Sequence, residues 1–453
     1  MNGEQLLIER KSLFERCIQV GSFEDLLSIQ ERIADSMRRC EHELKGTEKK
    51  DDLQFHIERL RLYADGLVWL VLHPHTIRQL AKNPGPPRSI EAQGEAFDQV
   101  LESARDHLMK DKVPVLIADI TNVIKIGDLV LCTNPEAPRI VECKTRLPHP
   151  RLFMRGRFGR QLSRTMSTLE YLSTGSAKVF GNERHQLVIE SPHASKRNWA
   201  ALTIVCTTAV SDKRAFFQLS NHEFIWAYSQ ENQDSVLAEV AKYGENLSCG
   251  FFGTSLGLIN MTDGLFPPPI VWPIPSELRF QLMEGQIVVA HLVDSKAFEC
   301  DLGNGERIEV SPQEDFPIRV VTGGKEYPLG RRFIYDVVYG FETVDSCVQG
   351  LIEFARQLHE QPPIDISAPH QAKPIVHFVE STEEAQKLAM SKDIPEDDFV
   401  VMPLELFEQM KGATRRPKEE AREIAKKHHG YKPTYPTMSM ETLKKLISKA
   451  HKG

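Results

Sequence analysis

The chain has no long apolar run and no cysteine pair with metal-ligand spacing. None of its 453 residues lies in a run approaching the ~18 apolar residues that a membrane span needs. The first residues, MNGEQLLIERKSLFER, contain acidic side chains and no signal-peptide core. The eight cysteines are far apart, without any Cys-x-x-Cys, which favours reduced thiols and gives no support for zinc. We therefore expect a cytoplasmic protein without a membrane partner.

A phosphate-binding loop of the ATPase type is also missing. The glycine-rich stretch 250–257, GFFGTSLG, lacks the Gly-Lys-Ser/Thr ending that such a loop requires. The net charge of −7 gives no global indication of nucleic-acid binding, so any such indication must come from how the charges are distributed.

Length and composition predict a multidomain globular chain. With 41% hydrophobic and 26% charged residues, 453 residues correspond to about two to four domains. Proline-rich stretches, NPGPPR at 83–88, FPPPIVWPIP at 266–275 and PPIDISAPHQAKP at 362–374, suggest boundaries. The expected parts are a helical region at 1–85, a core at 86–265, an antiparallel β module plus helix at 276–361, and a small α/β piece with a basic tail at 375–453.

The stretch 122–145, NVIKIGDLVLCTNPEAPRIVECKT, is the most informative. Aliphatic and β-branched residues around a proline-containing turn predict a β-hairpin. Side chains alternate along a strand, so Glu142 and Lys144 would share one face, and Asp128 on the preceding strand could lie beside them. Opposite charges in a buried strand require pairing or a metal, because a charge removed from water costs several kcal/mol.

Two carboxylates near a lysine indicate phosphodiester hydrolysis. Asp128 and Glu142 offer hard oxygen ligands suited to Mg²⁺ or Mn²⁺. Lys144 could orient or deprotonate the attacking water and neutralise charge that develops on phosphorus. The alternative is an exposed Glu/Lys pair at a sheet edge.

This pattern resembles the PD-(D/E)XK nuclease superfamily, here as Asp128 followed by Glu142-Cys143-Lys144, with Gly127 where the motif has proline. The resemblance covers at most 89–228. It implies an α/β (α+β) fold, a restriction-endonuclease-like mixed sheet flanked by helices, preceded by the helical region and followed by the β module. It also implies a glutamate near the metal from the first core helix, for which Glu95 is our choice, with a solvated acidic helix face as the alternative. Gln161 would hold water or a phosphate oxygen, and Arg164 would clamp a phosphate.

Basic residues concentrate just after the motif. Between Glu142 and Glu170 the chain has no Asp or Glu. Its basic side chains there, which could bind a phosphate backbone in a salt-sensitive way, are Lys144, Arg146, Arg151, Arg155, Arg157, Arg160 and Arg164. A solvated basic loop is the alternative. From Lys411 onward, 12 basic residues face 4 acidic ones, which fits either a nucleic-acid grip or a solvated tail.

Periodicity predicts the other elements. Helices are expected over 26–44 after a Ser22 cap, over 53–80, from Ser89 to 108 and over 158–172. Strands are expected over 113–120, 187–190, 200–210 and 286–293, then as hairpins over 298–310 and 318–327. A helix should follow over 344–359, and then a strand over 375–379 and a helix opened by Ser381.

Three functions fit these patterns. The leading hypothesis is a metal-dependent nuclease acting on nucleic acid, DNA favoured over RNA, as in restriction, repair or phage defence. The second is a non-catalytic nucleic-acid-binding or assembly protein on a nuclease-like core. The third is hydrolysis of another phosphoester. The N-terminal helices could also associate copies of the chain into a homo-oligomer, although simple packing is the favoured role.

Overall fold

The computed structural model describes residues 3–46, 50–81, 87–135, 138–141, 143, 176–178, 185–187, 195–245, 247, 250–254, 266–312, 314, 316–330, 332–360, 376–378, 382–390, 399–401, 437–439 and 444. The chain divides into two units, Met1–Ile140 with His149–Ile364, and Val141–Pro148 with Asp365–Gly453. The helices and small sheets place the protein in the α+β class. No helix in the described residues has the length and apolar character needed to cross a membrane.

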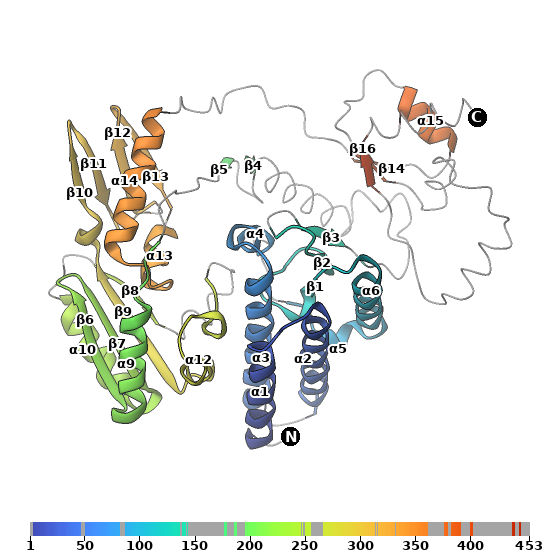
Figure 1. Ribbon diagram of the computed structural model, residues 1–453, viewed down its shortest axis with the longest axis horizontal. Helices are drawn as coiled ribbons and strands as arrows, with labels where there is room; N and C mark the ends of the chain where they lie inside the picture. The colour runs from blue at the N-terminus through green and yellow to red at the C-terminus, as the bar shows by residue number, and fades with distance from the viewer. Residues whose placement is uncertain are drawn as a thin grey trace. The chain divides into compact units, whose positions relative to one another are not determined.

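The N-terminal region is helical, as the periodicity predicts. Its helices are α1 (Gly3–Cys17), α2 (Phe23–Glu43), α3 (Lys50–Val71) and α4 (Pro74–Leu80), and the first three pack side by side (Figure 1). The predicted Ser22 cap is present, since its hydroxyl accepts the Asp25 N–H. Residues 53–80 belong to two helices rather than to the single helix expected. Pro74 starts α4, and a proline disfavours helical backbone in the residue that precedes it.

The next helix is also interrupted. Ser89 caps α5 (Ile90–Gln93), as predicted, but α6 (Glu95–Asp111) is a separate helix after Gly94. Gly94 has a φ of 53°, which a residue without Cβ adopts readily. After this break, α6 packs against the strands that follow it in the chain.

Two antiparallel strands and a third form the sheet that carries the motif. They are β1 (Val115–Ile117), β2 (Leu129–Leu131) and β3 (Arg139–Val141), in the order β1-β2-β3. Ile117 pairs with Leu129, and Val115 pairs with Leu131. The strands are shorter than the sequence suggests: the chain leaves β1 through a 3-10 turn, Ala118–Ile120, and residues 121–128 are irregular.

A second antiparallel sheet has the order β6-β7-β9-β8. Its members are β6 (Arg214–Ser220), β7 (Glu223–Ser229), β9 (Ile287–Asp294) and β8 (Gly250–Thr254). The helix α9 (Trp199–Asp212) covers one face, where Ile225 and Ala227 point, and α10 (Gln233–Glu245) covers the other, where Phe224 and Trp226 point. The strand β9 follows the segment 266–275 in the chain, yet it pairs with β7 and β8, which precede that segment. The segment 266–275 therefore does not separate two sheets.

The strand predicted over 200–210 is wrong: these residues belong to α9. Leu202, Val205, Cys206 and Ala209 are buried at helical spacing, and this face packs on the sheet. The β-branched residues of LTIVCTTAV favour a strand locally, but burial of one helical stripe overrides that preference. The segment 266–275 is likewise more than a linker. Trp272 and Ile274 are buried in the same core, and a 3-10 turn forms at Pro269–Val271.

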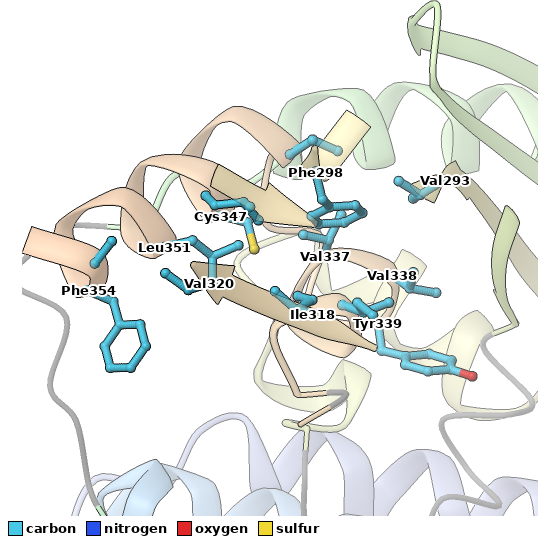
Figure 2. Packing of buried hydrophobic residues seen from close by; sticks show 14 of the residues in the cluster. Val293, Phe298, Ile318, Val320, Val337, Val338, Tyr339, Cys347, Leu351 and Phe354 are labelled. Atoms are coloured by element: carbon cyan, nitrogen blue, oxygen red, sulfur yellow. The ribbon is translucent and has the colours of Figure 1, made fainter. Parts of the chain in front are cut away.

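The predicted hairpins over 298–310 and 318–327 form one antiparallel sheet, whereas the strand predicted over 286–293, β9, belongs to the β6-β7-β9-β8 sheet. The hairpin sheet contains β10 (Cys300–Gly303), β11 (Glu306–Val310), β12 (Ile318–Thr322) and β13 (Lys325–Leu329), which form a meander after α12 (Ser276–Met283) and β9. Figure 2 shows Ile318 and Val320 packed against Cys347 and Leu351 of α14 (Val344–Glu360). Residues of α13 (Arg332–Val338), including Val337, complete this core.

Smaller elements complete the described structure. A two-stranded pair joins β4 (Ser176–Lys178) and β5 (His185–Leu187). In the second unit, β14 (Val376–Phe378) pairs in parallel with β15 (Phe399–Val401), which pairs antiparallel with β16 (Thr437–Ser439). The predicted helix after Ser381 is α15 (Thr382–Met390).

Candidate active site

Asp128 lies where the irregular segment enters β2. Its side chain is 5% exposed, and its backbone carbonyl accepts the Ala118 N–H at 3.0 Å, extending the β1–β2 ladder by one bond. The expectation that Asp128 lies within a long strand is thus corrected: it immediately precedes β2, and the chain on its other side is loop. The position of this carboxylate therefore depends on what holds that loop.

Asp65 on α3 holds the middle of the loop. One oxygen, Oδ1, accepts the backbone N–H groups of Asn122 at 2.7 Å and Val123 at 3.2 Å. The other, Oδ2, accepts the Asn122 side-chain amide at 2.8 Å. Burial raises the pKa of Asp65 to about 6, and the three donors together with nearby Arg61 oppose that rise. These donors take the place of water around the buried carboxylate.

Thr121 and Arg61 complete the support of the loop. The Thr121 hydroxyl donates to the Ala118 carbonyl at 2.9 Å and accepts the Ile124 N–H at 3.0 Å. The Arg61 guanidinium donates to the Asp119 carbonyl at 2.7 Å and to the Arg88 carbonyl at 3.0 Å. Backbone groups of an irregular, buried segment thereby find partners that a sheet would otherwise supply.

Gln30 on α2 closes the outer edge of β1. Its side-chain amide donates to the Val115 carbonyl at 2.8 Å, and its oxygen accepts the Ile117 N–H at 2.8 Å. The side chain thus imitates a neighbouring strand over one residue pair and satisfies buried backbone groups. Both ends of β1 are therefore held by one side chain of α2.

The opposite side of the sheet is tied to α6. Arg139, the first residue of β3, donates to Asp111 at 2.9 Å, and His107 contacts the same carboxylate at 2.9 Å. The hydrogen bond from His107, followed by the charges of His107 and Arg139, lowers the pKa of Asp111. Glu95 is exposed at the first position of α6, so the role predicted for it near the metal stays a prediction.

The remaining predicted site residues lie outside the described residues. For catalysis they are Glu142, Lys144 and Gln161, and for nucleic-acid binding they are Arg146, Arg151, Arg155, Arg157, Arg160 and Arg164. Within the described ranges no group of three or more His, Cys, Asp or Glu side chains could hold a metal ion. The described part of the site supplies one buried carboxylate, Asp128, which suits a hard cation, and the predicted second ligand directly follows β3.

Sequence reasoning missed Asp65, Asn122 and Gln30. A signal existed for the first: Asp65 interrupts the otherwise apolar run LYADGLVWLV in a helix. A carboxylate in such a run requires a buried partner. The partner could not be identified, because it is the backbone of a loop 57 residues away.

No protein-family model, curated protein or solved structure matches this chain.

Proposed function

We propose that this protein is a metal-dependent nuclease that hydrolyses phosphodiester bonds, with DNA favoured as the polymer. One observation supports this most: a buried aspartate, Asp128, lies at the start of a strand whose partner strand leads directly into Glu142-Cys143-Lys144. A hairpin of this kind can bring an acid from one strand to an acid and an amine on the next. The restriction-endonuclease-like arrangement of the core is part of the same proposal.

In this proposal each motif residue has a separate task. Asp128 and Glu142 would hold Mg²⁺ or Mn²⁺, which would supply Lewis-acid stabilisation of the phosphate. Lys144 would position water for attack and stabilise negative charge on the phosphoryl oxygens. Gln161 and Arg164 would contact phosphate, Glu95 would assist at the metal, and the arginines between 146 and 160 would attract the polymer.

Burial of Asp128 suits a ligand more than a surface charge. Asp128 is 5% exposed, so its side chain lies at a defined place in the protein rather than in bulk solvent. The segment before it is supported by two helical residues, Asp65 and Arg61, which gives a carboxylate in a loop the fixed position that metal binding requires.

The test compares cleavage by matched variants. Plasmid, linear and single-stranded DNA and a single-stranded RNA are incubated with the protein, with and without Mg²⁺ or Mn²⁺. We expect metal-dependent cleavage by the wild type and by Lys110→Ala, an exposed lysine on α6, and none by Lys144→Ala or Asp128→Asn. Equal cleavage by all variants would refute the proposal. Salt-sensitive binding without cleavage under any metal would favour a binding protein on a nuclease-like core.

The proposed setting is the cytoplasm. The cysteines in the described residues are all free thiols, which suits a reducing compartment. Association of copies through the N-terminal helices also remains a proposal. In the described structure these helices bury their apolar faces against one another, with Ile33, Met37 and Leu60 fully buried.

A further inference from the structure

The Asp65 carboxylate accepts hydrogen bonds from the loop that ends at Asp128. It is 3% exposed, and both of its oxygens accept hydrogen bonds from Asn122 and Val123. Asp65 comes from α3, in the region that sequence alone assigns to packing. Burying a carboxylate costs desolvation free energy, whereas an apolar residue would fill the same space without desolvating a charge.

The bonds around Asp65 form a continuous path to Asp128. Asp65 fixes the backbone at Asn122 and Val123, and the Thr121 hydroxyl fixes the next residue, Ile124. The same hydroxyl donates to the Ala118 carbonyl, while the Ala118 N–H donates to the Asp128 carbonyl. Both ends of the 118–128 loop are thus joined, and its middle is attached to a long helix.

We infer that Asp65 is a positioning residue for the metal site: by holding the 118–128 loop against α3, it sets the place and orientation of the Asp128 carboxylate. This inference rests on the proposed function only in treating Asp128 as a metal ligand. Residues that orient a ligand typically change metal affinity by roughly ten- to a hundredfold when they are removed. The N-terminal helical region is then part of the site.

The first experiment measures the loop directly. Hydrogen exchange of peptides covering 118–128 is compared in the wild type, Asp65→Ala and Tyr63→Phe. Tyr63 is the matched control, because it is fully buried on the same helix but donates to Glu284 and not to the loop. We expect faster exchange over 118–128 in Asp65→Ala and unchanged exchange there in Tyr63→Phe. Equal exchange in all three proteins would overturn the inference.

A polarity swap separates positioning from stability. In Asp65→Asn the new amide can still accept the two backbone N–H groups, but its NH₂ meets the Asn122 amide, so two donors oppose each other. Adding Asn122→Asp restores an acceptor. We expect the double variant to recover loop protection that Asp65→Asn loses. Failure to recover, with a folded protein by circular dichroism, would count against the assigned geometry.

The second experiment measures metal binding without turnover, by titrating Mn²⁺ calorimetrically. We expect Asp128→Ala to abolish the site, Asp65→Ala to weaken Mn²⁺ roughly tenfold or more, and Tyr63→Phe to leave the affinity unchanged. Wild-type protein that binds Mn²⁺ through Asp128 but cuts no nucleic acid would refute only the nuclease proposal. Affinity that is independent of Asp65 would refute only the positioning role. Absence of Asp128-dependent binding would overturn both.

Discussion

Arg10 and Glu284, which are 274 residues apart in the chain, form a buried ion pair in which the guanidinium engages both carboxylate oxygens. Nε lies 3.1 and 2.9 Å from the two oxygens, and Nη2 lies 2.8 Å from Oε2. Tyr63 donates to the same carboxylate at 2.9 Å. The pair links α1 to the end of α12, beside the Phe14–Phe280 ring contact. It therefore ties the helical region that supports Asp128 to the rest of the same unit.

Removing one member of this pair should destabilise the protein strongly. In Arg10→Met the Glu284 carboxylate would stay buried and would keep, of the two residues that contact it above, only Tyr63. We expect the free energy of unfolding to fall by about 3–5 kcal/mol, because the buried Glu284 carboxylate loses its ion-pair partner. Urea unfolding followed by circular dichroism measures this.

The double variant Arg10→Met/Glu284→Leu is the matched comparison. It removes both charges, so it should lose less stability than Arg10→Met alone. Arg38→Ala, which breaks the exposed pair with Asp98, should cost under about 1 kcal/mol. A double variant that is less stable than the single one would show that the ion pair contributes more than its apolar replacement.

His56 should make the protein sensitive to acid. Arg10 can only donate, so its 3.2 Å contact requires an unprotonated His56 Nδ1, and Nε2–H then donates to Ser36 at 3.0 Å. Burial first, and then the charges of Arg10 and Arg39, lower the pKa of His56 to about 3. The unfolded chain therefore binds a proton that the native protein does not, between pH ~6.5 and ~3.

The sign of the effect is that stability rises with pH. The contribution is complete above pH ~6.5 and is lost as the pH falls toward 3, by on the order of 5 kcal/mol. Asp65, with its pKa raised to about 6, acts in the opposite direction. Unfolding of wild type and His56→Gln is therefore compared at each pH, so that Asp65 cancels. Parallel curves for the two proteins would contradict the prediction.

Much of the fold could be predicted because its signals are local. The Ser22 and Ser89 caps, the hairpins around Gly303–Gly305 and Gly323–Gly324, and the helix α14 are each encoded by adjacent residues. The prediction of a strand over 200–210 is wrong, because the residues of this segment also place apolar side chains along one side of a helix. The helix forms because the sheet of β6, β7, β9 and β8 buries its apolar side. The strands of that sheet come from distant parts of the chain, so the local sequence does not reveal it.

For the candidate site, too, the local features could be predicted from the sequence and the long-range contacts could not. The position of Asp128 beside a strand follows from the aliphatic residues around it, although the extent of that strand was overestimated. The support from Asp65, Arg61 and Gln30 could not be predicted, because each bonds to backbone groups, which carry no residue identity. Sequence patterns can indicate that a buried charge needs a partner, but not which peptide group provides it.

Gly66 should tolerate no side chain. A Cβ at this position of α3 would collide with Cγ2 of Ile270, in the proline-rich segment that packs against the helix. We expect Gly66→Ala to destabilise the protein by about 1–3 kcal/mol, even though alanine favours helices. Ile270→Ala removes the colliding atom, so the double variant should be more stable than the sum of the single changes predicts. Thermal unfolding of the four proteins tests this, and additive changes would contradict it.

The arginines after the motif should control nucleic-acid binding through charge. If Arg151, Arg155 and Arg157 contact phosphates, replacing all three with alanine should weaken binding across DNA sequences alike. The slope of log affinity against log salt should also fall by about three, since each neutralised phosphate releases roughly one counterion. Fluorescence anisotropy with a labelled duplex at several salt concentrations measures both quantities. The control is a triple alanine variant at Lys110, Lys112 and Lys213, which lie outside the basic segment between Glu142 and Glu170. A solvated loop would instead leave affinity and slope equal in the two variants, because charges that touch no phosphate release no counterions on binding.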